Sequence, residues 1–127
     1  MEAVKTKELR TYICQVDRDQ PVEKQTKFIL GVLNAEEEAY LRDSYTGESK
    51  SGSETYRALN IGLEEVINLT ENGVEVKVER DPRKGRLPGG KYLWGDSILK
   101  IDRNARDEIA LEIFKSTLLS EEALKNL

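Results

Sequence analysis

The sequence predicts an α+β fold in a single domain, residues 1–127. We expect a small, mainly antiparallel sheet of three to four strands, two main helices on one face and a short C-terminal helix. The length of 127 residues fits one domain. Segments with apolar residues at every second position alternate with segments that repeat at three and four residues, which indicates strands and amphipathic helices. Charged residues make up 35% and hydrophobic residues 38%, so the core is expected to be small.

The first two strands are predicted over residues 9–16 and 25–33. Apolar residues alternate in both segments, and Phe28, Leu30 and Val32 would share one face of the second strand. Residues 17–21 form a charged turn that closes on a proline. The two strands can therefore pair as antiparallel neighbours. Cys14 is predicted to be a small buried hydrophobic residue in the first strand, the alternative being a reactive thiol.

Two helices are predicted next. Asn34 and Glu37 have the spacing of a reciprocal helix cap, and the helix that they begin would run to about Asp43. Residues 46–53 are small and polar and predict a loop, which lacks the order of a phosphate-binding loop. The second helix would begin at Ser53 or Glu54. Its apolar residues recur at three and four positions: Tyr56, Leu59, Leu63, Val66 and Ile67.

The C-terminal half continues with one strand and two helices. Asn72 and Gly73 either end the second helix or make a tight turn. Valines at 74, 76 and 78 predict a strand with one buried face, and residues 97–101 a single helical turn. Asp102 or Asn104 would cap the last long helix, and Ser120 would begin a short terminal one. The long helix has an apolar stripe: Ile109, Ala110, Ile113, Phe114 and Leu118.

Composition argues against several classes of function. The chain has no histidine and one cysteine, which removes most hydrolase and metalloenzyme schemes, so we expect no enzyme activity, cofactor or metal. Acidic residues at 17, 19 and 36–38 either bind a hard cation such as Mg²⁺ or Ca²⁺, or belong to a turn and a helix cap; the cap is a sufficient explanation. The net charge of −4 disfavours general nucleic-acid binding. No apolar run is long enough to span a membrane and no signal peptide is visible, so the expected location is the cytosol.

Two segments are candidate binding sites. The first is the basic loop, residues 80–91, with the aromatic residues that follow it. It is either a clamp for phosphate or an acidic surface, or a solvated hairpin tip kept soluble by its charge. Its candidate residues are Arg80, Arg83, Lys84, Arg86, Lys91, Tyr92 and Trp94. The second is the C-terminal end, where Leu119, Leu124 and Leu127 either complete the core or dock a partner.

Three stretches together resemble small proteins encoded among the structural genes of tailed bacteriophages, of tail-assembly or virion-associated type. They are the acidic turn that leads through Gln25 and Thr26 into a strand, the mid-chain helix followed by a glycine turn and a strand, and the close at 106–113 and 119–126. The basic loop departs from this pattern. The resemblance implies a non-enzymatic assembly role, other phage structural proteins as partners, and a place in the host cytoplasm or the virion.

The alternative from another class is a small regulator or inhibitor that uses the basic loop to bind nucleic acid or a nucleoprotein complex. The sequence leaves both the partner and the oligomeric state open.

Overall fold

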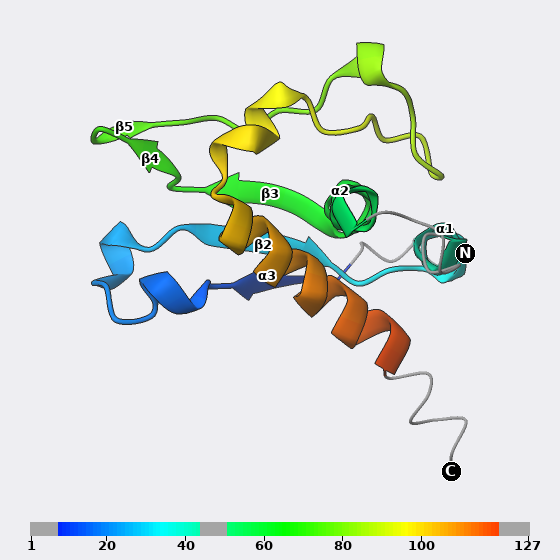
Figure 1. The fold of residues 1–127 in the computed structure, drawn as a ribbon, viewed down its shortest axis with the longest axis horizontal. Coiled ribbons are helices and arrows are strands. Elements are labelled where there is room, and N and C mark those ends of the chain that lie inside the picture. Colours follow the sequence, from blue (N-terminus) through cyan, green and yellow to red (C-terminus); the bar gives the residue numbers. More distant parts are fainter. Residues whose placement is uncertain (1–7, 44–50, 120–127) are drawn as a thin grey trace, which may run out of the picture.

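The computed structural model describes residues 8–43 and 51–119, and within these ranges the fold is α+β (Figure 1). A three-stranded antiparallel sheet has the order β1-β2-β3, and β4 and β5 form a separate two-stranded hairpin. The expected antiparallel sheet is confirmed, but its strands divide between two sheets. The strands are β1 Leu9–Tyr12, β2 Lys27–Gly31, β3 Leu63–Ile67, β4 Thr70–Glu71 and β5 Val74–Glu75. The α-helices are α1 Ala35–Asp43, α2 Ser51–Gly62 and α3 Arg103–Phe114.

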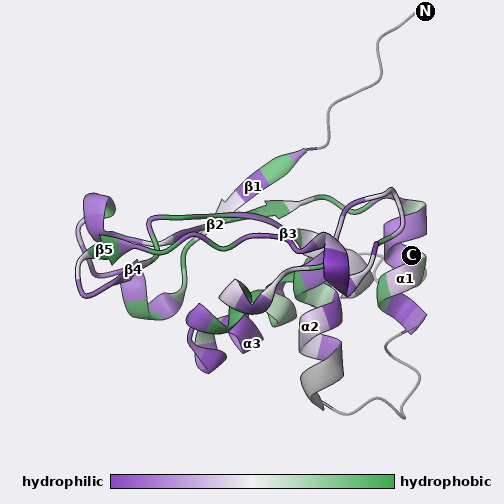
Figure 2. Ribbon diagram, turned by 90° about the horizontal axis from the view of Figure 1, so that it is seen from above, coloured by the Kyte–Doolittle hydropathy of each residue, from purple (hydrophilic) through white to green (hydrophobic). Residues whose placement is uncertain are grey.

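The core lies between the three-stranded sheet and two of the helices. Figure 2 shows α2 and α3 on the same side of the sheet, with α1 beyond its end. Phe28 and Leu30 of β2 are buried in one cluster with apolar residues of α2 and α3, among them Leu59 and Ile109. This side of the sheet is therefore covered, and β2 contributes alternate residues to the core.

The first strand is shorter than expected because the chain bends toward α3. β1 ends at Tyr12, and a 3-10 helix, Gln15–Asp17, follows. The Gln15 N–H donates to Oε2 of Glu108 on α3 at 3.0 Å. Cys14 is buried as predicted, at 2% exposure, but it follows the strand instead of lying in it.

The second strand pairs with the first in antiparallel register, as predicted. It covers Lys27–Gly31, two residues shorter at each end than expected. Val32, predicted to share the buried face, lies beyond the strand and is 52% exposed.

The predicted cap of the first helix is confirmed. The Glu37 N–H donates to Oδ1 of Asn34 at 2.9 Å, and the Asn34 N–H donates to Oε1 of Glu37 at 3.1 Å. The helix ends at Asp43, as predicted. α2 begins at Ser51, so residues 51–53 of the expected loop are helical, and the part at 46–50 lies outside the described residues.

The prediction that the second helix continues through Leu63, Val66 and Ile67 was wrong, because Leu63–Ile67 is strand β3. In its pairing with β2, Val66 lies opposite Phe28 and Leu63 lies opposite Leu30, with a register shift between them. This bulge places Leu63 and Val66 on the same face although they are three residues apart. The apolar spacing of a helix is therefore produced by an irregular strand.

The turn at Asn72 and Gly73 is the tight turn of the β4–β5 hairpin. Their φ angles of 52° and 80° are the positive pair that a type I′ turn requires. The strand predicted over the three valines is reduced to Val74–Glu75. Val74 is 69% exposed, so the prediction that this strand has a buried face was wrong. Val78 packs against the core from outside the strand.

The last long helix begins at one of its two predicted caps. Asp102 is the cap, because its carboxylate accepts the Asn104 N–H at 3.0 Å. The single helical turn expected at residues 97–101 is a 3-10 helix, Asp96–Lys100. Ile109, Ala110 and Ile113 are buried. α3 continues as a π-helical segment, Lys115–Leu119, and the helix predicted from Ser120 lies outside the described residues.

Within residues 8–43 and 51–119, no helix combines the length and the apolar character needed to cross a bilayer.

Candidate binding site at the basic loop

Backbone hydrogen bonds close the basic loop into an irregular hairpin. Arg80 forms an antiparallel β-bridge with Trp94, and Arg86 forms one with Tyr92. The Asp81 N–H donates to the Leu93 carbonyl at 2.8 Å, and the Leu93 N–H donates to the Gly85 carbonyl at 3.1 Å. The loop therefore has a defined path away from the core and back.

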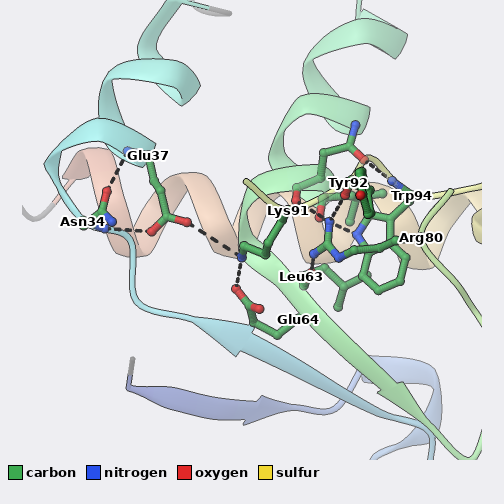
Figure 3. A network of polar contacts seen from close by, with 10 residues as sticks. Asn34, Glu37, Leu63, Glu64, Arg80, Lys91, Tyr92 and Trp94 are labelled. Carbon is green, nitrogen blue, oxygen red and sulfur yellow. Dashed lines mark hydrogen bonds and ion pairs between the residues drawn. The ribbon is translucent and has the colours of Figure 1, made fainter. Parts of the chain in front are cut away.

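The guanidinium of Arg80 fixes the base of the loop to the end of α2 (Figure 3). Its Nη2 donates to the Leu63 carbonyl at 2.8 Å, and its Nη1 donates to the carbonyls of Asn60 at 3.2 Å and Tyr92 at 2.7 Å. The last carbonyls of a helix lack partners within the helix and attract a positive charge. Arg80 therefore acts as a cap for α2, and burial lowers the pKa of its guanidinium.

Trp94 fixes the returning strand of the loop to the same end of α2. Its backbone N–H donates to Oδ1 of Asn60 at 2.8 Å, and its indole N–H donates to the Leu59 carbonyl at 2.9 Å. The side chain is 6% exposed, and the Arg80 guanidinium carbon lies 4.1 Å from the centre of its ring. One face of the indole is thereby covered by a cation, a contact that is stronger when it is desolvated.

Lys91 attaches the loop to two more elements. Its ammonium lies 2.6 Å from Oε1 of Glu64 on β3 and 3.8 Å from Oε2 of Glu37 on α1. Glu37 is 4% exposed and uses its other oxygen in the cap with Asn34. The two carboxylates partly enclose the ammonium, as Figure 3 shows. Lys91 therefore links the loop to the first helix and to the sheet.

Three cations remain at the surface of the loop. Arg83 has a side chain that is 90% exposed and binds Asp81, with Nε to Oδ1 at 3.1 Å and Nη2 to Oδ2 at 3.2 Å. These contacts hold the pKa of the Asp81 carboxyl below its usual range. Lys84 forms an ion pair with Asp96. Arg86 lies with its guanidinium carbon 5.3 Å from the centre of the Tyr92 ring.

The structure thus divides the seven predicted residues of the basic loop into two groups. Arg80, Lys91 and Trp94 bind the rest of the protein, whereas Arg83, Lys84 and Arg86 extend from the surface and Tyr92 lies beneath Arg86. The surface group carries three positive charges on a loop fixed at its base. Such an arrangement can bind an anionic surface, in competition with Asp81 and Asp96.

Three residues of this region make contacts that the sequence did not predict. Glu37 was predicted only as part of a helix cap, and Asn60 and Glu64 had no predicted role. No local pattern identifies such contacts, because they join residues 27 to 54 positions apart. The only available signal was Glu64 and Glu65 interrupting an apolar segment.

The other candidate residues lie apart from the basic loop. Leu119 is the last residue of the π-helical segment, and Leu124 and Leu127 lie outside the described residues. Cys14 is buried, and burial raises the pKa of its thiol to about 12. In residues 8–43 and 51–119, no three Asp, Glu or Cys side chains gather closely enough to hold a metal ion.

Comparison with protein-family models, with curated proteins and with solved structures found no match for this chain.

Proposed function

We propose that this protein is a non-enzymatic binding protein that contacts an acidic surface of another protein through Arg83, Lys84 and Arg86. The observation that carries the proposal is the fixed presentation of these three cations. Arg80 and Lys91 hold the base of the loop through hydrogen bonds and ion pairs to α2, β3 and α1. A binding loop that is already ordered loses less conformational entropy when it binds.

A protein partner is favoured over nucleic acid by the state of the aromatic rings. Unpaired bases are held by stacking on exposed aromatic faces. The Trp94 ring is buried under Arg80, and the Tyr92 ring has Arg86 over it. The cations are also accompanied by Asp81 and Asp96, which lower the positive potential that a phosphate backbone needs.

The proposal of a non-enzymatic role is supported by the reactive groups that the chain contains. It has no histidine, and its single thiol is buried with a raised pKa. Neither a serine–histidine pair nor a cysteine–histidine pair is therefore available as an activated nucleophile. The resemblance to tailed-bacteriophage structural-block proteins makes particle assembly the proposed setting and other phage structural proteins the proposed partners.

The test is copurification of the tagged full chain with the head and tail proteins encoded in its own genome. We expect one of them to copurify with the wild type. The triple variant Arg83→Glu, Lys84→Glu, Arg86→Glu should weaken the complex at least tenfold, because each attraction becomes a repulsion. Dissociation constants measured by calorimetry on the purified pair give the size of the change.

The matched control reverses three other exposed cations: Lys24→Glu, Lys77→Glu and Arg103→Glu. It changes the net charge equally and should leave the affinity within about twofold. Equal loss in both triple variants would assign the effect to net charge and contradict a site at the loop. Copurification of no head or tail protein would remove the proposed setting. Salt-sensitive binding of DNA or RNA oligonucleotides, lost only in the loop variant, would favour the regulator instead.

A further inference from the structure

The three-stranded sheet has a second face that α2 and α3 do not cover. Phe28 and Leu30 point toward the helices, so the alternate residues of β2 point the other way. Figure 2 shows no α-helix of the described residues over that side. The strand register then identifies the residues of this outer face. Its residues are Leu9, Thr11, Lys27, Ile29, Gly31, Glu65 and Ile67.

Apolar side chains cross the outer face along one diagonal. Leu9 lies opposite Gly31, two residues from Ile29, and Ile67 lies opposite Lys27, two residues from Ile29 on the other side. Diagonal neighbours in an antiparallel sheet are about 7–8 Å apart, within reach of long side chains. Leu9 is 58% exposed and Ile67 is 38% exposed, so the two ends of this apolar diagonal are at the surface.

The two charges of the outer face lie on either side of the apolar diagonal. Lys27 precedes Ile29 on β2, and Glu65 lies opposite Ile29 on β3. Neither side chain makes an ion pair or hydrogen bond within the described part of the chain. The other two residues, Thr11 and Gly31, also lie on opposite sides of the apolar diagonal. Thr11 is on the same side as Lys27, and Gly31 is on the same side as Glu65.

We propose that the outer face binds the outer face of a second copy of this chain, with the two-fold axis along the apolar diagonal. A half-turn about that line places Leu9, Ile29 and Ile67 on their own counterparts. It exchanges the two sides of the diagonal, so Lys27 of each copy meets Glu65 of its partner. Thr11 of each copy meets Gly31, which has no side chain to exclude it. The face is therefore complementary to itself in polarity and charge.

This geometry belongs to known classes of assembly and packing. A two-fold dimer uses the same patch on both copies, which is the commonest closed symmetry of homo-oligomers. An axis along the diagonal makes the strands of the two copies cross at a large angle, as in orthogonally packed sheets. The face has seven residues, fewer than a stable interface uses on each side, so we expect a dissociation constant of about 10–100 μM.

Sedimentation equilibrium from about 5 μM to 1 mM tests the proposal on the full chain. Lys27→Glu and Glu65→Lys each create two like-charge contacts in the dimer, and each should raise the dissociation constant about tenfold. The double variant restores both contacts with the signs exchanged, so its dissociation constant should lie within about threefold of the wild-type value. Leu9→Glu places a charge on the apolar diagonal and should leave a monomer over the whole range.

The matched control is the pair Lys24→Glu and Glu75→Lys, two exposed charges outside the outer face, which should leave the constant unchanged. Thermal unfolding of the monomers checks that every variant is folded. A wild type that stays monomeric up to about 1 mM would overturn the proposal. So would a dimer that responds neither to Lys27→Glu nor to Glu65→Lys, such as one formed along the free edge of β1, or a double variant that is no better than either single one.

Discussion

At the scale of single residues, burial decides what each cation of the basic loop does. The five basic residues at 80, 83, 84, 86 and 91 look equivalent in the sequence. Arg80 donates to three carbonyls and lies on an indole ring, whereas Arg83 is 90% exposed and binds only a neighbouring carboxylate. The sequence predicted these residues as one candidate binding site. It could not divide the cluster, because the carbonyls that Arg80 binds belong to distant segments that the fold brings together.

Arg80→Lys should destabilise the protein although it preserves the charge. An ammonium cannot donate in the planar fork that reaches Leu63, Asn60 and Tyr92 together, and it leaves at least one part-buried carbonyl without a partner. We expect a loss of about 2 kcal/mol or more in the free energy of unfolding, measured by urea denaturation. Arg83→Lys in the same loop is the control and should change stability by less than about 0.5 kcal/mol. Equal effects would refute the capping role of Arg80.

At the scale of elements, the sequence predicted the features that nearby residues determine and missed those that depend on long-range pairing. The cap formed by Asn34 and Glu37 and the tight turn at Asn72 are each determined by residues within a few positions, so the sequence predicted them. The boundary between α2 and β3 was missed, because the bulge in β3 gives Leu63 and Val66 the spacing of a helix. Only pairing with β2 reveals the strand, and that pairing is not encoded locally.

Gly62 ends α2 where α3 approaches, and a larger residue should not fit. A Cβ at this position would lie 2.7 Å from Cγ2 and 2.8 Å from Cδ1 of Ile113. Gly62→Ala should therefore lower the free energy of unfolding by about 1–3 kcal/mol, although alanine is the better helix former.

Ile113→Val removes Cδ1, one of the three Ile113 atoms that lie within 3 Å of the added Cβ, and provides a partial rescue for Gly62→Ala. In a double-mutant cycle followed by chemical denaturation, we expect Gly62→Ala to cost less in the Ile113→Val background than in the wild type. Additive effects of the two substitutions would show that the contact between Gly62 and Ile113 does not limit the packing of α2 against α3.

At the scale of the whole molecule, a half-buried polar contact joins the first strand to the last long helix. The Tyr12 hydroxyl donates to Oε2 of Glu108 at 2.8 Å. Burial, with a further contribution from Glu108, raises the pKa of Tyr12 to about 12 and that of Cys14 to about 12. Both groups are neutral when protonated, so the folded protein holds these protons more tightly than the unfolded chain does.

The stability of the protein should therefore fall in alkali. The ordinary pKa values are 9.0 for Cys14 and 10.0 for Tyr12, so the stabilisation is complete below about pH 9 and is lost as pH rises toward 12. Cys14, the more buried of the two groups, steepens the decline by up to about 1.4 kcal/mol per pH unit, and Tyr12 steepens it by less. Denaturation of the wild type, Tyr12→Phe and Cys14→Ala from pH 6 to 11 measures the slopes. The variants should run parallel to the wild type below pH 8 and decline less above pH 9; identical slopes throughout would contradict this assignment.

The contacts of Arg80 also determine how the molecule opens. If the final turn of α2 unwinds, Arg80 loses the Asn60 carbonyl and Trp94 loses the Asn60 amide oxygen and the Leu59 carbonyl, so both stems of the basic loop are weakened in the same event. We therefore expect local opening of the loop and of the end of α2 to be coupled. By thermodynamic linkage, a ligand captured at the loop would protect α2 against local unfolding, and loosening α2 would weaken capture of that ligand.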